Sequence, residues 1–154
     1  MTEAASKPDP MTLALAEAAK AEAAGEVPVG AVLVDGAGGA VLASAHNRVE
    51  ELADPTAHAE LLAIQQAARR MGSKRLTGAD LYVTLEPCPM CAQAIAFARL
   101  RRLYFGAYDP KGGGVDHGAW IFEHRSCHHR PEVIGGVQEQ ACGALLLDFF
   151  KERR

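Results

Sequence analysis

The sequence predicts a single α/β domain in which helices pack on a mixed β-sheet. Its 154 residues are enough for one hydrophobic core and too few for two. A helix and a strand hairpin come first, and alternating helical and strand patterns follow, an order typical of α/β architectures. With 49% hydrophobic and 23% charged residues, the composition is that of an ordinary globular protein. We expect one domain over residues 1–154, with residues 1–8 disordered.

Proline and glycine mark the bounds of the first expected elements. Pro10 suits the first position of a helix, and Gly25 ends the alanine-rich run that follows. Two apolar runs then flank a glycine-rich turn, which predicts a β-hairpin. The expected elements are a helix over 11–24, strands over 27–34 and 40–45, and a polar loop over 47–55.

Helical and strand patterns alternate through the rest of the chain. The expected elements are helices over 58–71, 88–98 and 138–154 and strands over 81–85, 103–107 and 132–137. Between two of these strands lies a long segment over 109–130, which contains three consecutive glycines. Connections of this length in compact domains are more often functional than idle, so we expect this segment to contribute to function.

Two short motifs, His58-Ala59-Glu60 and Pro87-Cys88-Pro89-Met90-Cys91, carry the residue types of a metal centre. One histidine and two cysteines suit zinc, and three protein ligands leave the fourth tetrahedral position for water, as in catalytic zinc sites. Cys88 and Cys91 share one face of a predicted helix start, where the thiolate that binds metal is favoured. His58 also falls in the first turn of its helix, so two helix starts are expected to converge on one Zn²⁺ ion.

Glu60 follows the histidine by two positions and is not needed as a ligand. Zinc lowers the pKa of bound water to about 7. A carboxylate within about 2.6–3.2 Å can move protons between that water, a ring nitrogen and a leaving amino group. The combined His-x-Glu and Pro-Cys-x-x-Cys pattern is the signature of zinc-dependent nucleobase deaminases. These residues therefore predict hydrolytic deamination, with Glu60 as the catalytic acid and base.

Other cysteines and histidines leave alternatives open. A structural zinc site would take a fourth ligand, and a second metal site is conceivable in the 109–130 segment. A Cys-x-x-Cys pattern alone is also compatible with a redox pair. The candidate donors are Cys142 for a fourth ligand, His117 and His124 for a second site, and Cys127, His128 and His129 for either. A chain of this size does not need disulfides, so reduced cysteines in the cytoplasm are expected.

The net charge of −3 creates no global field that attracts nucleic acid, so an RNA partner would need a local basic patch. The candidates for such a patch are Arg99, Arg101 and Arg102, then His128, His129 and Arg130, and finally Lys151, Arg153 and Arg154. No apolar run approaches the ~20 residues of a membrane span, and the N-terminus lacks a signal-peptide pattern, so no membrane partner is expected.

Longer segments around these motifs carry a family resemblance. They include residues 26–34, 47–48, 54–60, 82–91, 105–111, 129–130 and 144–150. With them, the chain from Met11 to its C-terminus resembles the bacterial tRNA-specific adenosine deaminases. The zinc motif alone would indicate only the cytidine deaminase superfamily. The lead-in Thr84-Leu85-Glu86-Pro87 and the aromatic and basic C-terminal helix point to the tRNA enzymes.

The resemblance implies a three-layer α/β/α cytidine-deaminase-like fold with a five-stranded mixed sheet, a homodimer, and one Zn²⁺ per subunit. It implies conversion of adenosine to inosine at the wobble position of a tRNA anticodon, typically of an arginine tRNA. The implied ligands are His58, Cys88 and Cys91, with Glu60 as the proton shuttle. The implied substrate residues are Asn47 at the flipped nucleotide, Val29, Leu85 and Pro87 around the base, Asp109 facing the anticodon backbone, and Phe149 and Lys151 along the nucleotide path.

Two other functions stay open from the sequence. A guanine or cytosine deaminase that acts on free nucleobases or nucleosides would use the same fold and the same zinc motif. A zinc-stapled RNA-binding module without catalysis is the alternative outside enzymes. Such a module has no use for Glu60 beside the metal, so the presence of this carboxylate favours an enzyme.

Overall fold

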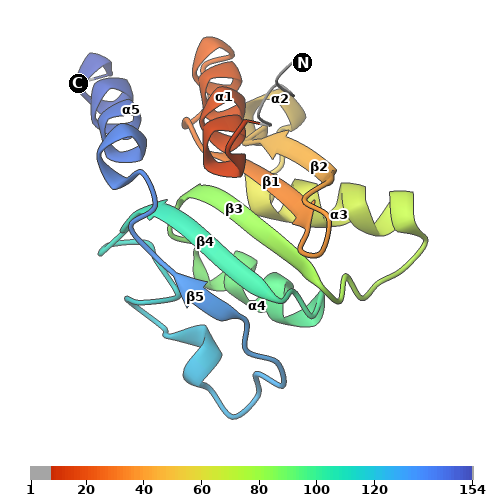
Figure 1. Ribbon diagram of the computed structural model, residues 1–154. Coiled ribbons are helices and arrows are strands. Elements are labelled where there is room, and N and C mark those ends of the chain that lie inside the picture. The colour runs from red at the N-terminus through yellow and green to blue at the C-terminus, as the bar shows by residue number, and fades with distance from the viewer. Residues whose placement is uncertain (1–7, 154) are drawn as a thin grey trace, which may run out of the picture.

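The computed structural model describes residues 8–153 as a five-stranded mixed sheet between two layers of helices (Figure 1). The helices are α1 (Pro10–Ala23), α2 (Val49–Leu52), α3 (Ala59–Met71), α4 (Pro89–Phe97), the 3₁₀ turn η1 (Ile121–Glu123) and α5 (Glu139–Glu152). The strands are β1 (Gly30–Asp35), β2 (Val41–His46), β3 (Ala79–Leu85), β4 (Arg102–Ala107) and β5 (Glu132–Ile134). The predicted fold class is confirmed.

The sheet combines an antiparallel and a parallel part in the order β2-β1-β3-β4-β5. Strand β1 pairs antiparallel with both β2 and β3, whereas β3, β4 and β5 run parallel. The register of β3 and β4 places Leu85 opposite Ala107, so these two strands end side by side. The residues that follow them therefore leave the sheet at the same edge.

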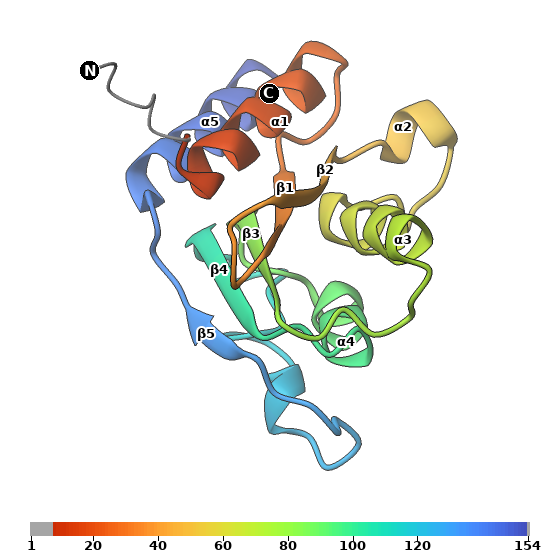
Figure 2. The ribbon, with the colours of Figure 1, turned by 45° about the vertical axis from the view of Figure 1, so that its right-hand side comes forward.

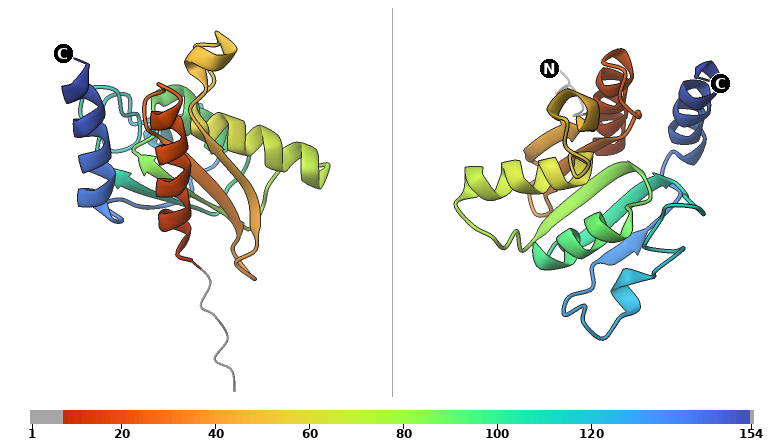
Figure 3. Two further views of the ribbon diagram at one scale, coloured as in Figure 1. Left: turned by 90° about the horizontal axis from the view of Figure 1, so that it is seen from above. Right: turned by 180° about the vertical axis from the view of Figure 1, so that it is seen from behind.

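Helices α1 and α5 cover one face of the sheet, and α3 and α4 cover the other (Figure 2). The alternation of side chains along β1 serves both layers: Ala31 and Leu33 face the core under α3 and α4, while Val32 and Val34 face α1. Gly30 lets α1 approach closely, because a Cβ there would lie 2.5 Å from the backbone nitrogen of Ala18. Helix α5 stands beside α1 on the same face (Figure 3).

Several expected bounds differ from the structure for local reasons. Strand β1 begins at Gly30 rather than residue 27, because the N–H of Val29 turns back to the carbonyl of Val27 (2.8 Å). Strand β5 ends at Ile134, since Gly136 has a φ of 79° that bends the chain before α5. The expected polar loop over 47–55 contains α2, and the 109–130 segment contains η1.

Residues 1–8 are predicted to be disordered. Residues 1–7 lie outside the described part of the chain, and Pro8 is exposed. That residues 1–154 form one domain stays a prediction. Among the described helices, none combines the length and the apolar character that crossing a membrane requires.

Candidate active site

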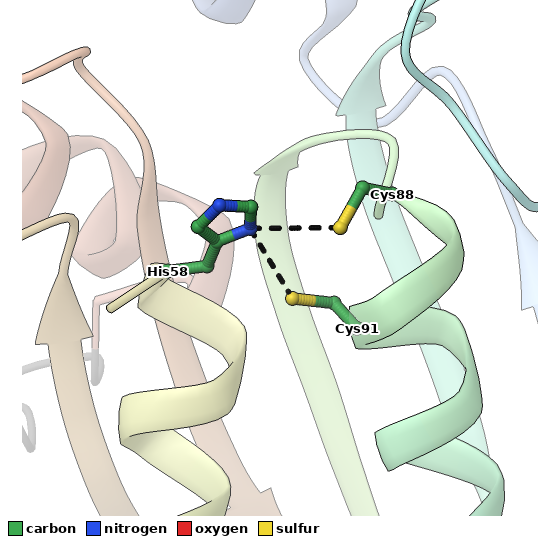
Figure 4. A group of neighbouring side chains, drawn as sticks. All are labelled: His58, Cys88 and Cys91. Atoms are coloured by element: carbon green, nitrogen blue, oxygen red, sulfur yellow. Dashed lines mark hydrogen bonds between the residues drawn. The ribbon is translucent and has the colours of Figure 1, made fainter. Parts of the chain in front are cut away.

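Helices α3 and α4 begin next to each other, each with a residue of the zinc motif at its N-cap. His58 precedes α3 with extended backbone angles (φ −78°, ψ 148°), and Cys88 precedes α4 in a similar conformation (φ −69°, ψ 169°). Pro89 occupies the first turn of α4, where the missing N–H costs nothing. Cys91 follows within the first turn of α4, and the three side chains point toward one another (Figure 4).

The cluster of His58, Cys88 and Cys91 has the dimensions of a zinc site. The Nδ1 atom of His58 lies 3.5 Å from each of the two Sγ atoms, and all three ligand atoms lie within 4.8 Å of one another. Zinc binds imidazole nitrogen and thiolate sulfur at about 2.0–2.3 Å, so the edge of such a tetrahedron is about 3.5 Å long. The donor set and its spacing therefore fit Zn²⁺.

Burial and mutual contacts set the pKa values of these ligands. A hydrogen bond from the Cys91 thiol lowers the pKa of Cys88 to about 4, and the His58 ring acts in the same direction. The same bond to Cys88, together with burial, raises the pKa of Cys91. The bond with Cys88 also raises the pKa of His58. One thiolate thus forms readily in the cluster, and a bound divalent cation would favour the second.

Within the described residues, this trio is the one cluster of three or more metal-ligating side chains. His117 bonds to the Glu86 carboxylate, His129 to the Leu100 carbonyl (2.6 Å), and the Cys127 thiol to the His129 carbonyl (3.1 Å). The donors considered for a second metal site in the 109–130 segment therefore do not gather into such a cluster among the described residues. No fourth protein ligand among the described residues joins the trio either, an arrangement typical of catalytic zinc.

Glu60 lies in the first turn of α3, beside the cluster, and its side chain is buried. Burial raises the pKa of Glu60 to about 7, and Cys88, His58 and Cys91 are close enough to influence it. A carboxyl group whose pKa lies near neutrality can both accept and donate a proton. The role of Glu60 as the catalytic acid and base stays a prediction, with which this pKa is compatible.

Asn47 connects the N-terminus of α3 to the residue that precedes β1. Its side-chain oxygen accepts a hydrogen bond from the N–H of Ala59 (2.8 Å), and its own N–H donates to the Val29 carbonyl (3.1 Å). The predicted contact of Asn47 with a nucleotide therefore falls to its amide NH₂ group, because the oxygen is already engaged. Asn47 has a second role that the sequence did not indicate, which is to satisfy a free N–H at the start of the His58 helix.

Three predicted pocket residues, Val29, Leu85 and Pro87, lie at the carboxyl end of β3 and just before β1. Pro87 immediately precedes Cys88, and Val29 is bonded to Asn47. Leu85 packs against both hydrophobic cores and is half-buried. Pro87 thus lies next to a cluster residue, and Val29 lies next to Asn47. Leu85 also packs in the hydrophobic core. Their contact with a base stays a prediction.

Phe149 on α5 faces inward, and Phe150 faces solvent. Phe149 is 3% exposed, whereas Phe150 is 51% exposed. Phe149, Asn47 and Arg153 line a cavity of about 280 Å³, and the Arg153 guanidinium lies 3.6 Å from the centre of the Phe149 ring. Phe149 thus shares a cavity with Asn47, and its contact with the nucleotide stays a prediction. Lys151 is exposed and does not line this cavity, whereas Arg153, which the sequence indicated only as part of a basic patch, does line it.

Several of the predicted basic groups are paired with acidic side chains. Arg101 forms an ion pair with Asp80 (2.7 Å), Arg102 with Glu132 (2.8 Å), and Arg130 with Glu123. None of the ion pairs within residues 8–153 involves Lys151. The end of α5 is therefore a better candidate for phosphate contacts than these three paired arginines.

Comparisons with known proteins agree with this geometry. Residues 6–107 match the family described as the cytidine and deoxycytidylate deaminase zinc-binding region. The tRNA-specific adenosine deaminase of Agrobacterium fabrum is 54% identical over 144 residues, which cover 94% of this chain and 93% of that protein.

Two solved structures bear on the substrate class. One, from studies of A-to-I editing by tRNA:A34 deaminases at the wobble position of transfer RNA, has a TM-score of 0.86 and 54% identity, covering 89% of this chain and 98% of the other. The other is a guanine deaminase from Bacillus subtilis, with a TM-score of 0.60 and 39% identity over 64% of this chain and 62% of that chain.

Proposed function

Because the chain belongs to the zinc-binding cytidine and deoxycytidylate deaminase family, we propose that it hydrolyses adenosine to inosine at the wobble position of a tRNA anticodon. The observation that carries this proposal is the 54% identity to a tRNA-specific adenosine deaminase over 94% of the chain. The 144 aligned residues of the 154-residue chain reach well beyond the zinc motifs.

Each residue of the candidate site has a separate task in this reaction. His58, Cys88 and Cys91 would hold the zinc, which when bound supplies a Lewis acid that makes water reactive at neutral pH. Glu60 takes a proton from the attacking water and passes it to the purine ring nitrogen. Glu60 then assists proton transfer to the leaving amino group, so that ammonia departs as the C6 carbonyl forms.

Substrate selection falls to the residues around the cluster. We assign to the amide NH₂ of Asn47 a hydrogen bond to the nucleotide, because its side-chain oxygen already accepts from Ala59, and to Val29 and Pro87 apolar contacts with the base. Phe149 and Arg153 border the cavity beside Asn47, where an aromatic ring and a guanidinium suit a base and a phosphate. Asp109 and Lys151 complete the proposed contacts with the anticodon loop.

The alternative of a free guanine or cytosine deaminase is less well supported. The guanine deaminase of Bacillus subtilis aligns with 64% of this chain, whereas the wobble-position tRNA deaminase structure aligns with 89%. A purely RNA-binding module is disfavoured by Glu60, because burying a carboxyl group beside the metal ligands costs free energy and a structural zinc site makes no use of it.

The test is deamination of a tRNA anticodon stem-loop that carries adenosine at the wobble position, read as inosine formation and ammonia release. Free adenosine, guanine and cytosine serve as competing substrates under the same conditions. Inosine in the stem-loop alone supports the proposal. Faster turnover of a free base would instead establish the alternative function. Stem-loops with other anticodons would test the further prediction that an arginine tRNA is the substrate. The location of the protein in the cytoplasm stays a prediction.

We also propose that the active protein is a homodimer. Support comes from an apolar and basic face on the outer side of α3 and α4, where Phe97 is 72% exposed. Phe97, Ile64 and Ala94 line a cavity of about 400 Å³ there. Exposed aromatic residues of this kind are typical of protein interfaces. Light scattering at micromolar concentration should give about twice 16.3 kDa, and Phe97→Asp should yield a monomer. A fully active wild-type monomer would contradict the proposal.

A further inference from the structure

Glu86 is a buried carboxylate that the reaction described above does not use. Its side chain has no exposed surface, and it stands between the end of β3 and Pro87. Oε1 accepts hydrogen bonds from the N–H of Asp109 (3.0 Å) and from Nδ1 of His117 (2.8 Å). Oε2 accepts from the N–H groups of Val115 (3.2 Å) and Asp116 (2.9 Å). The Glu86 side chain thus forms hydrogen bonds with both ends of the segment 109–117.

The hydrogen-bonding pattern requires a carboxylate at this position. All four partners are donors, and each carboxylate oxygen accepts two of them. A glutamine would turn an NH₂ group toward two of these donors, and the buried groups would lose their partners. The position of Glu86 therefore requires a side chain that accepts hydrogen bonds on both oxygens, and a side chain of the same size without this property does not suffice.

The fastened segment lies directly against the start of α4. The N–H of Glu86 donates to the Ala107 carbonyl (2.8 Å), and the N–H of Gly114 donates to the Pro87 carbonyl (2.8 Å). A Cβ on Gly114 would come within 2.5 Å of the Pro89 nitrogen and 3.0 Å of the Cys88 carbonyl carbon. The 109–117 segment thus borders the residue that carries one of the metal ligands.

We propose that Glu86 is a positioning residue, which holds the segment 109–117 and with it Asp109 at the edge of the metal cluster so that the anticodon loop can bind. This inference rests on the proposed function for the identity of the substrate. Glu86 fixes the backbone of Asp109, and the Asp109 carboxylate in turn accepts from the N–H of Gly112 (2.9 Å). Loosening the 109–117 segment weakens substrate binding. The zinc ligands keep their positions, because the N-termini of α3 and α4 hold them.

The test compares Glu86→Gln with Glu132→Gln, a matched change at an exposed carboxylate on β5. We expect Glu86→Gln to keep its zinc, to exchange the amide hydrogens of Asp109, Val115 and Asp116 at least ~10-fold faster, and to raise KM for the anticodon stem-loop more than it lowers kcat. Glu132→Gln should match the wild type in all three readouts. Loss of zinc in Glu86→Gln, or unchanged exchange, would overturn the proposal.

His117→Ala supplies a second variant in case Glu86→Gln does not fold. The His117 side chain is 33% exposed, so its removal deletes one of the four hydrogen bonds without opening the core. We expect a rise of about 3- to 10-fold in amide exchange over 109–117, the range for one hydrogen bond, with normal zinc content. Unchanged exchange in this variant contradicts the positioning role. Amide exchange needs no substrate, so a failure of the proposed function is distinguishable from a failure of this inference.

Discussion

The metal cluster draws its three side chains from two helix starts, whereas the surface around it comes from parts of the chain that are far apart in sequence. His58, Cys88 and Cys91 are brought together because α3 and α4 pack side by side on one face of the sheet. The surrounding surface combines Asn47, the 109–117 segment and the end of α5. The chemistry is thus carried by two short motifs whose residue types identify it, and recognition by side-chain contacts that no short motif identifies.

The largest effect is expected from a substitution in the metal cluster. Cys88→Ala removes one of three ligands from a cluster with no fourth protein donor among the described residues, so we expect loss of both zinc and deaminase activity. Cys127→Ala is the matched control, because the Cys127 thiol donates to the His129 carbonyl and is not a member of the metal cluster, so the zinc should stay in place. Metal analysis of the two purified variants decides the matter. Stoichiometric zinc in Cys88→Ala would refute the ligand assignment.

Glu60→Ala separates catalysis from metal binding within the same region. Because Glu60 is not a ligand, we expect normal zinc content and normal RNA affinity, with turnover lower by at least ~10². Glu22→Ala on α1 changes the same residue type on the opposite face of the sheet and should retain full activity. Single-turnover kinetics on a stem-loop gives the comparison. Turnover close to that of the wild type would assign the proton transfers to another group.

The difference between the two regions also explains what the sequence could predict. The zinc ligands follow from residue type and spacing, and the strand and helix patterns indicated the fold class. Glu26 and Glu86 could not be predicted from such patterns. Glu26 accepts from the N–H groups of Glu50 and Glu51, 24 and 25 residues away, and so stabilises the short helix α2. The partners of Glu86 lie 23 to 31 residues further on.

The predicted ends of some strands differ from the observed ends for a related reason. A local pattern shows which residues favour a strand, but not where a neighbouring strand ceases to pair. The pairing of β5 with β4 ends at Ile134, because Gly136 turns the chain and the N–H of Val137 then reaches the carbonyl of Phe105 (3.0 Å). Contacts of this kind depend on the assembled sheet.

An intermediate effect is expected at Gly113, where the two regions meet. A Cβ there would lie 2.5 Å from both the Asp109 carbonyl oxygen and the Glu86 carboxyl carbon, so Gly113→Ala must displace the segment. Overpacking of this kind costs about 1–3 kcal/mol, and the same free energy lost from binding corresponds to roughly a 5- to 150-fold reduction in apparent stem-loop affinity. We expect the zinc content to stay normal. Equilibrium binding and metal analysis of the same preparation measure both.

Gly143→Ala is the control for this substitution. Gly143 lies in α5, and no atom lies within 4 Å of the position that a Cβ would take. Because alanine favours a helix over glycine by up to about 1 kcal/mol, this variant should have a higher Tm and unchanged affinity. If both glycine variants bound the stem-loop as the wild type does, the 109–117 segment would not be part of the recognition surface.

The smallest expected effect concerns charge at the end of α5, of which residues 151–153 are described and Arg154 lies outside the described part of the chain. Deletion of residues 151–154 should weaken RNA binding and flatten its salt dependence, with zinc content intact. Each cationic side chain that neutralises a phosphate of single-stranded RNA contributes ~0.7 to the slope of log affinity against log salt. The deletion also removes Arg153 from the face of Phe149, so single substitutions are needed to separate charge from packing.

Lys151→Gln and Arg153→Gln make that separation, with Lys20→Gln on α1 as the matched control. Lys151 takes part in none of the ion pairs within residues 8–153, so its change should lower the salt slope by the ~0.7 of a single phosphate and leave Tm unchanged. Arg153→Gln should also reduce affinity at high salt, because the guanidinium packs on Phe149 beside the cavity that Asn47 lines. Lys20 pairs with Glu17 far from the cluster, and Lys20→Gln should bind like the wild type. Equal salt slopes in all three variants would move the phosphate contacts from α5 to the 109–130 segment, and recognition would then rest on the segment that Glu86 holds.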